Sequence, residues 1–198
     1  QEVIGKHRAV IFGGNGYSEE WHNIAKERGL ANLPTTADAL PVLKEKSTKE
    51  LFERTGVLSS ADLESRFEVY AEQYILSIDM EVKLVTDMAK TVVYPAAMRH
   101  LENIATTVTG LEQMGISLNR DHINGVAYLT NSLTDNIDKL QSATAKSDFG
   151  TTEEHMQYYA TTLCPLMKDV RADVDALEAE IADDLWPLPT YEEMLFIK

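Results

Sequence analysis

Apolar residues recur at steps of three and four positions along most of the chain beyond residue 58, which is the spacing of one face of an α-helix. The first series follows Ser59-Ser60 and comprises Leu63, Phe67, Tyr70, Tyr74, Ile78, Val85, Met88, Val92, Leu101, Ile104 and Val108, ahead of Gly110. At about 1.5 Å per residue, a helix of roughly 50 residues spans about 75 Å. The period resumes beyond Pro95, so we expect this proline to bend the helix rather than end it.

Two further helical series follow. The second alternates steps of three and four, as in a heptad seam, and comprises Ile123, Val126, Thr130, Leu133, Ile137 and Leu140. The third follows the capping box Thr151-Thr152-Glu153-Glu154 and comprises Met156, Tyr159, Leu163, Leu166, Val170, Val174, Leu177, Ile181 and Leu185, ahead of Trp186-Pro187. Connections of about ten residues or fewer return the chain alongside itself. The predicted fold class is therefore all-α: an elongated, kinked antiparallel bundle of three long helices.

Short helices and tight turns are expected ahead of this bundle, together with a glycine-rich turn. Ser18, Asp38 and the capping box Ser47-Thr48-Lys49-Glu50 should open three short helices, and Gly29 and Gly56 should end the first and the third. The predicted organisation is a connecting segment over residues 1–58, a long-helix bundle over residues 59–186 and a C-terminal tail over residues 187–198.

The charge balance narrows the classes of partner. The chain has 18 Lys and Arg against 32 Asp and Glu, a net charge of −14, which repels phosphate backbones and anionic lipid surfaces. No apolar run approaches the roughly 20 residues of a membrane helix, and QEVIGKHRAV lacks the apolar core of a secretory leader. Cys164 is the single cysteine, which suits a reducing compartment. We therefore expect a cytoplasmic protein that binds neither nucleic acid nor membranes.

The stretch AVIFGGNGYSEEW, residues 9–21, is the best candidate for a nucleotide site, because a β-branched run, a glycine turn and a helix start can together hold a phosphate. Gly14-Asn15-Gly16 supplies two glycines of a dinucleotide fingerprint, but Glu19 occupies the third position, where a carboxylate would repel a pyrophosphate. No Lys-Ser or Lys-Thr pair follows, as a Walker motif requires. We therefore expect a structural turn whose glycines permit positive φ.

The other candidate groups do not combine into a site. Glu19 and His22 form a single Glu-x-x-His step, whereas di-iron bundles use this step twice. The remaining histidines stand alone, without a second ligand at helical spacing, and are expected to be surface or capping residues: His7, His100, His122 and His155. Cys164 has apolar neighbours and no nearby base, which predicts an inert thiol. No catalytic, cofactor-binding or metal-binding residue is predicted in this chain.

Long stretches of the sequence carry a family resemblance. The run VIFGGNGYSEEWHNIAKERGLANLPTTADALPVL resembles a segment toward the C-terminus of type III glutamine synthetases, the large bacterial form of the enzyme. Four further stretches resemble the rest of that region: STKELFERTGVLSSADLESRFEVYAEQY, VVYPAAMRHL, CPLMKDVRADVDALE and DLWPLPTYEEMLF. The resemblance covers essentially all 198 residues.

The resemblance implies a parent enzyme that joins ammonia to glutamate with ATP, through a γ-glutamyl phosphate, using magnesium or manganese ions held by glutamates and a histidine. It implies ring assemblies whose active sites lie between neighbouring catalytic domains, with the catalytic barrel upstream of the matched region. None of the family's metal ligands, ATP-binding arginines or ammonia-site residues can be placed on this sequence. The segment is therefore expected to be non-catalytic and to serve assembly, with other subunits of the homo-oligomeric ring as partners, or regulation.

Two interpretations of the segment's context remain open. The chain begins at Gln1 with QEVIGKHR, which is typical of the last turns of an amphipathic helix, so we expect it to be the C-terminal piece of a longer polypeptide. The alternative is a free-standing acidic helical module without ligase ancestry. Such a module would bind a basic partner through its acidic face or dimerise through its heptad seam.

Overall fold

A computed structural model describes residues 1–195, so the last three residues of the predicted tail lie outside the described part of the chain. All regular structure over this range is helical, with no β-strand, which confirms the predicted all-α fold class. None of the described helices combines the length and the apolar character needed to cross a membrane. The chain divides into two compact units, Gln1–Phe67 (unit 1) and Glu68–Lys198 (unit 2), which are described separately.

Unit 1 consists of short helices, as the sequence predicts. They are α1 (Glu2–Lys6), the 3₁₀ turn η1 (Arg8–Val10), α2 (Glu19–Glu27), α3 (Thr36–Ala39), the 3₁₀ turn η2 (Leu40–Lys44) and α4 (Lys46–Thr55), followed by the first residues of α5 (Ser60–Met88). Gly29 and Gly56 follow α2 and α4 with φ of 68° and 67°, the left-handed conformation that lets glycine end a helix.

The caps of these short helices differ from the prediction in three places. Ser18 precedes α2, but its hydroxyl donates to the Asn15 carbonyl rather than accepting from the helix. Thr35, not Asp38, caps α3, because its Oγ1 accepts the Asp38 N–H and the Asp38 carboxylate in turn accepts from the threonine hydroxyl. The predicted box at Ser47 lies inside α4, which begins one residue earlier after Glu45.

One long helix runs through α5, the π-helical turn η3 (Ala89–Val93) and α6 (Tyr94–Gln113), 54 residues in all. Pro95 is the second residue of α6, so only Tyr94 separates it from the π turn. Proline lacks an N–H and its ring crowds the carbonyl four residues earlier, and the wider turn accommodates both effects. The prediction that the helix continues through Pro95 is confirmed, and the helix ends beyond Gly110, before Gly115 at φ 82°.

The two returning segments also follow the predicted apolar series. They are α7 (Asp121–Thr144), then α8 (Thr152–Tyr158), the π turn η4 (Tyr159–Leu163) and α9 (Cys164–Glu180), with a 3₁₀ turn η5 (Asp183–Leu185) and α10 (Tyr191–Leu195) at the end. Thr151 caps α8 by accepting the Glu154 N–H, as the capping box predicts. The turn η4 precedes Pro165 as η3 precedes Pro95, a feature that the sequence analysis missed. The last long helix ends at Glu180, short of the predicted stop at Trp186.

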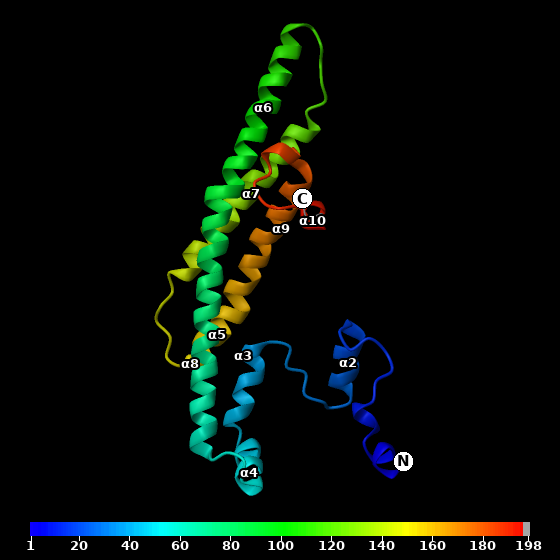
Figure 1. The fold of residues 1–198 in the computed structure, drawn as a ribbon, viewed down its shortest axis with the longest axis vertical. Helices are drawn as coiled ribbons and strands as arrows, with labels where there is room; N and C mark the ends of the chain where they lie inside the picture. Colours follow the sequence, from blue (N-terminus) through cyan, green and yellow to red (C-terminus); the bar gives the residue numbers. More distant parts are fainter. Residues whose placement is uncertain (196–198) are drawn as a thin grey trace. The chain divides into compact units, whose positions relative to one another are not determined.

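The core of unit 2 forms where α7 lies alongside both α6 and α9 (Figure 1). The heptad seam of α7 is buried, and Thr130 within it satisfies its hydroxyl by donating to the Val126 carbonyl at 2.7 Å. The main buried cluster comprises Ile78, Val82, Ala89, Val93, Ala97, Val126, Leu133, Ile137, Leu140, Tyr159, Leu163, Val170, Leu177 and Ile181. Because the seam is used within the chain, it offers no apolar stripe for dimerisation.

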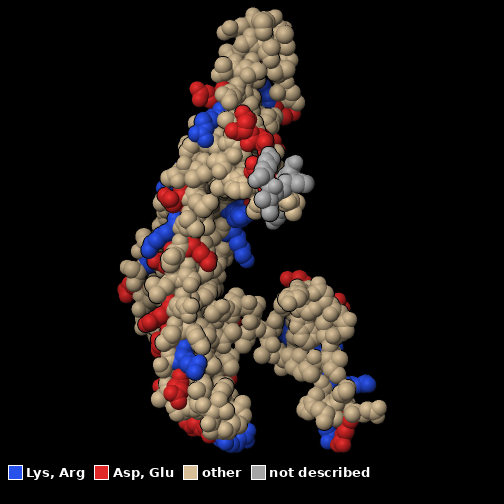
Figure 2. Space-filling view, viewed as in Figure 1, with Lys and Arg blue, Asp and Glu red and all other residues tan. Residues whose placement is uncertain are grey.

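The turn between α6 and α7 forms an end of unit 2 with few charged residues, called here the hairpin tip and comprising residues 103–119. Glu112 is its single charged residue, and Arg120 pairs with it at 2.6 Å. Figure 2 shows this end free of the red and blue side chains that are scattered over the rest of unit 2 on the same face. Met114, Ile116 and Leu118 are exposed on the tip, although the chain as a whole is strongly acidic.

Candidate functional site

The polar contacts of the glycine loop between η1 and α2 hold the backbone of the loop in place. The guanidinium of Arg28, just after α2, donates to the carbonyls of Ala9 at 3.0 Å and Ile11 at 2.8 Å. The Asn15 side chain accepts the Tyr17 N–H at 3.0 Å, and the Ser18 hydroxyl donates to the Asn15 carbonyl at 2.7 Å. These contacts fit the structural turn expected from the sequence.

The reason for glycine in this loop differs from the prediction. In the described chain, positive φ occurs only at Gly29, Gly56 and Gly115, so the expectation of left-handed glycines in the loop is wrong. Gly14 is needed for space instead, because a Cβ there would lie 2.6 Å from Cζ of Phe12. The Phe12 ring packs against Trp21 with centroids 4.9 Å apart. The glycine therefore permits a close side-chain approach.

The Glu-x-x-His step lies at the start of α2 and is not joined by further ligands. His22 pairs through Nδ1 with Oδ1 of Asn32 at 3.0 Å, which occupies one of its two ring nitrogens. Across residues 1–195, no group of three His, Cys, Asp or Glu side chains is arranged to hold a metal ion.

His100 and His122 are brought together, contrary to the expectation that each stands alone. His100 on α6 is 8% exposed, and its Nε2 lies 3.4 Å from Nε2 of His122 at the start of α7. Nδ1 of His122 lies 3.0 Å from Oε2 of Glu180, the last residue of α9. The Ala182 N–H donates to Nδ1 of His100 at 3.4 Å. Burial, and next the neighbouring His122, lower the pKa of His100 below the ordinary 6.5.

A second polar cluster joins α5 to the π turn η4. The Tyr159 hydroxyl donates to Oδ1 of Asp79 at 3.1 Å, and Lys83 pairs with Oδ2 at 2.7 Å. Burial raises the pKa of Tyr159 to about 12, and the hydrogen bond from Lys83 lowers the pKa of Asp79. The tyrosine therefore stays protonated and the aspartate stays charged near neutrality, so the pair is a fixed contact rather than a proton donor and acceptor for chemistry.

His155 and Cys164 do not form an active site. His155 on α8 stacks on Phe149 with centroids 4.1 Å apart, and burial lowers its pKa. Cys164 is half-buried, and its Sγ lies 3.9 Å from the Tyr74 hydroxyl. Neither contact supplies the base that a nucleophilic thiol needs.

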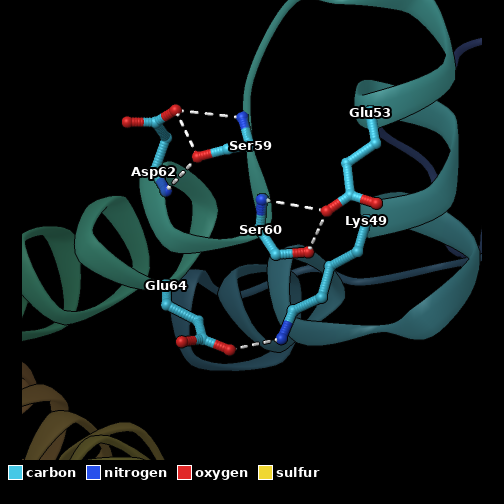
Figure 3. A network of polar contacts seen from close by, with 6 residues as sticks. All are labelled: Lys49, Glu53, Ser59, Ser60, Asp62 and Glu64. Atoms are coloured by element: carbon cyan, nitrogen blue, oxygen red, sulfur yellow. Dashed lines mark hydrogen bonds and ion pairs between the residues drawn. The ribbon is translucent and has the colours of Figure 1, made fainter.

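An exposed polar network of unit 1 sets the start of α5 (Figure 3). Ser59 and Asp62 cap the helix reciprocally, and the bonds from Ser59 lower the pKa of the Asp62 carboxyl. Glu53 accepts from the backbone and hydroxyl of Ser60, and Lys49 pairs with Glu64 at 2.6 Å. Ser59, Asp62 and Glu53 hold the first residues of α5, and the Lys49–Glu64 pair joins α4 to α5, so these contacts fit a structural role.

Comparisons with known proteins identify the family to which this chain is related. The family model for the glutamine synthetase C-terminal domain matches residues 1–112. The type-3 glutamine synthetase of Dictyostelium discoideum is 33% identical over 207 residues, covering 100% of this chain and 28% of that protein. Glutamine synthetases of Bacteroides fragilis (27% identical, 100% of this chain, 30% of that protein) and Butyrivibrio fibrisolvens (28% identical, 99% of this chain, 29% of that protein) match similarly.

The chain thus spans less than a third of the length of these relatives, and it aligns with them along essentially its whole length. The family model covers more than half of the chain, from its first residue to Glu112 near the end of α6. The chain belongs to the glutamine synthetase C-terminal domain family.

Proposed function

We propose that this chain is part of a cytoplasmic, ATP-dependent glutamate–ammonia ligase, which makes glutamine from glutamate, ammonia and ATP. The observation that carries this proposal is the alignment of essentially the entire chain with three glutamine synthetases. The match to a C-terminal domain family points the same way. Common ancestry with these ligases argues against a free-standing helical module of unrelated origin.

Within the ligase, this segment is non-catalytic, and ATP and magnesium or manganese ions are held by the rest of the polypeptide. The residues present fit neither group. The glycine loop uses its polar groups on its own backbone and has Glu19 where a phosphate would lie. No described cluster offers three metal ligands. No catalytic step is therefore assigned to this segment.

The segment's role is assembly, through contact of the hairpin tip with another subunit of a homo-oligomeric ring. Two copies of a chain with a net charge of −14 repel each other, and the repulsion is weakest where charges are few. The tip meets that condition and exposes Met114, Ile116 and Leu118. A shallow groove beside them is lined by the small or uncharged residues Ala105, Thr106, Thr109, Gly110 and Gln113, which allow another helix to approach closely.

The activity is tested on the full-length protein. We expect glutamine and inorganic phosphate to form from glutamate, ammonia and ATP in the presence of Mg²⁺. Failure to form glutamine with either Mg²⁺ or Mn²⁺, by a protein that is folded, would contradict the ligase proposal.

The assembly role is tested separately by a matched pair of methionines. Met114 on the tip is 69% exposed and Met80 on α5 is 72% exposed, so the two differ in place but hardly in exposure. We expect Met114→Asp to release smaller species in sedimentation velocity of the full-length protein, and Met80→Asp to leave the assembly intact. Equal sedimentation of Met114→Asp and the natural protein would contradict the proposed tip contact without bearing on the ligase activity.

A further inference from the structure

Two hydrogen bonds and one close His–carboxylate contact run in series from the chain after α9, through α6, to α7 and the end of α9. They run from the Ala182 N–H to Nδ1 of His100 (3.4 Å), from His100 Nε2 to His122 Nε2 (3.4 Å), and from His122 Nδ1 to Oε2 of Glu180 (3.0 Å). The two imidazole rings meet edge to face with centroids 5.7 Å apart. The segment that follows α9 is thus tied back to the two helices of the hairpin.

The protons of this series can be assigned from the Ala182 end, where the direction of the bond is fixed. A backbone N–H only donates, so Nδ1 of His100 accepts and its Nε2 carries the proton. That Nε2–H donates to Nε2 of His122, so the proton of His122 lies on Nδ1, facing the Glu180 carboxylate, which only accepts. Both rings are therefore neutral, and each of the three links contains one hydrogen.

A single additional proton breaks this arrangement wherever it binds. If Glu180 remains ionised, a third proton on the two rings places two hydrogens in one link, either between the rings or between His100 and the Ala182 N–H. Two donors facing each other repel instead of bonding, and a buried donor without an acceptor is costly. No choice of ring tautomers removes the conflict.

We propose that His100, His122 and Glu180 form a proton-operated latch that ties the chain at Ala182 to α6 near neutral pH and loosens the segment that follows it in mild acid, while Leu185, Trp186 and Leu188 still pack against the core. Burial of His100 makes the neutral ring the stable form in the closed latch, which agrees with the direction of its lowered pKa. The charged or titratable groups that face His100 are His122 from α7, Glu180 from α9 and Asp184 from η5. The two carboxylates favour protonation, and burial and the second histidine oppose it.

A bridging metal ion does not explain the paired histidines. A metal on Nε2 of His100 would require the proton on Nδ1, where an acceptor must then lie. The group found at Nδ1 is the Ala182 N–H, which is a donor. The hydrogen-bond pattern thus fits the neutral pair of rings and not a metal-bound one.

The latch controls a defined part of the chain. Ile181 directly follows α9 and is 6% exposed, and the Trp186 N–H bonds back to the Ala182 carbonyl at 3.1 Å. The turn η5 packs against α6 next to this point. Loss of the Ala182 bond therefore removes one of the ties that hold η5 and the residues beyond it.

The experiment is peptide-resolved hydrogen exchange of the full-length protein at about pH 7.5 and about pH 5.5, corrected for intrinsic rates, because an unperturbed histidine titrates between these values. We expect protection of residues 181–189 to fall roughly tenfold at the lower pH, the equivalent of about one net hydrogen bond. Protection of α7 near Leu133 should stay constant. Equal protection of residues 181–189 at both pH values would overturn the proposal.

Three variants and a chelator separate the latch from other causes. His100→Asn keeps an acceptor near the Nδ1 position but cannot be protonated, so protection should no longer depend on pH. If His100→Asn fails to fold, His122→Gln serves in its place and should shift the midpoint of the response. His155→Asn, which removes another histidine with a lowered pKa, should leave the response intact. A response that persists unchanged in the folded latch variant, or that disappears with a chelator, would overturn the proposal.

Discussion

The glycine loop matches a sequence motif but is structural, whereas the pair His100 and His122 matches no motif but forms a contact between helices. The loop AVIFGGNGYSEEW has the outline of a nucleotide site, yet Arg28 and Asn15 use its polar groups to hold its own backbone. His100 and His122 are 22 positions apart and match no motif, yet they meet at 3.4 Å and join three helices. A local motif can thus be purely structural, and a functional arrangement can arise from helix pairing alone.

The largest expected effect concerns the helices that carry the histidine pair. Leu133 on α7 is fully buried in the core of unit 2, so Leu133→Ala should lower the free energy of unfolding by about 2–5 kcal/mol. Chemical denaturation followed by circular dichroism measures this change. Leu76→Ala, at a position that is 64% exposed, is the control and should change the free energy by less than about 0.5 kcal/mol. Similar losses of unfolding free energy in Leu133→Ala and Leu76→Ala would mean that the buried seam of α7 does not position His100 and His122.

The next effect concerns the loop. Gly14→Ala places a Cβ against the half-buried Phe12 ring, which must then turn away from Trp21, and loss of this ring contact should cost about 1 kcal/mol. Gly13→Ala is the matched control, because nothing lies within 4 Å of its Cβ. Hydrogen exchange of α2 would report the difference. Equal protection in the two variants would remove the packing explanation for this glycine.

A smaller loss of stability is expected from substitution of Arg28, which bonds to the backbone of the loop. Arg28→Met keeps the length of the side chain but removes both bonds to the carbonyls of Ala9 and Ile11. Because the bonds are exposed, we expect a loss of about 1 kcal/mol or less in unit 1. Exchange of the amides of residues 9–17 should accelerate while that of α4 does not. No acceleration would show that the turn holds without Arg28.

The smallest expected effect is the pH dependence of stability that His100 contributes. Its pKa is lower in the folded chain than in the unfolded chain, so the unfolded chain binds more protons at acid pH. The contribution is fully present above the ordinary value of 6.5 and is lost as the pH falls through the folded pKa. His155 acts in the same direction, so the measurement compares the natural chain with His100→Asn. A difference between them that grows with acidity in favour of the natural chain would contradict this sign.

The sequence predicts the helices well because their burial is periodic. The seam of α7 and the passage of the helix through Pro95 follow from spacing and from proline chemistry alone. The π turns do not, because they depend on how the chain accommodates a proline within a packed helix. The end of α9 at Glu180 is likewise set by tertiary contacts, since the apolar period continues to Leu185.

The candidate sites divide in the same way. The sequence alone shows that Glu19 stands at the third position of the glycine pattern, where a carboxylate would repel a phosphate. The role of Gly14 depends on where the Phe12 ring lies. The meeting of His100 with His122 requires the register between α6 and α7, which no short-range pattern contains. If α6 and α7 are assumed to pair as a hairpin, His100 and His122 fall on opposite sides of its turn. That pairing is the one signal from which their contact could have been predicted.

The proposed function requires that this helical segment be carried by a much longer ligase polypeptide. The most direct test is the mass of the native polypeptide that contains these residues, measured by immunoblot of its source cells with an antibody raised against them. If the proposed function is correct, the mass of the band should be about three times the 22.1 kDa of this chain, because the chain covers 28–30% of the length of its relatives. A single band at 22.1 kDa would contradict it and would leave a free-standing module whose function must lie in its partners.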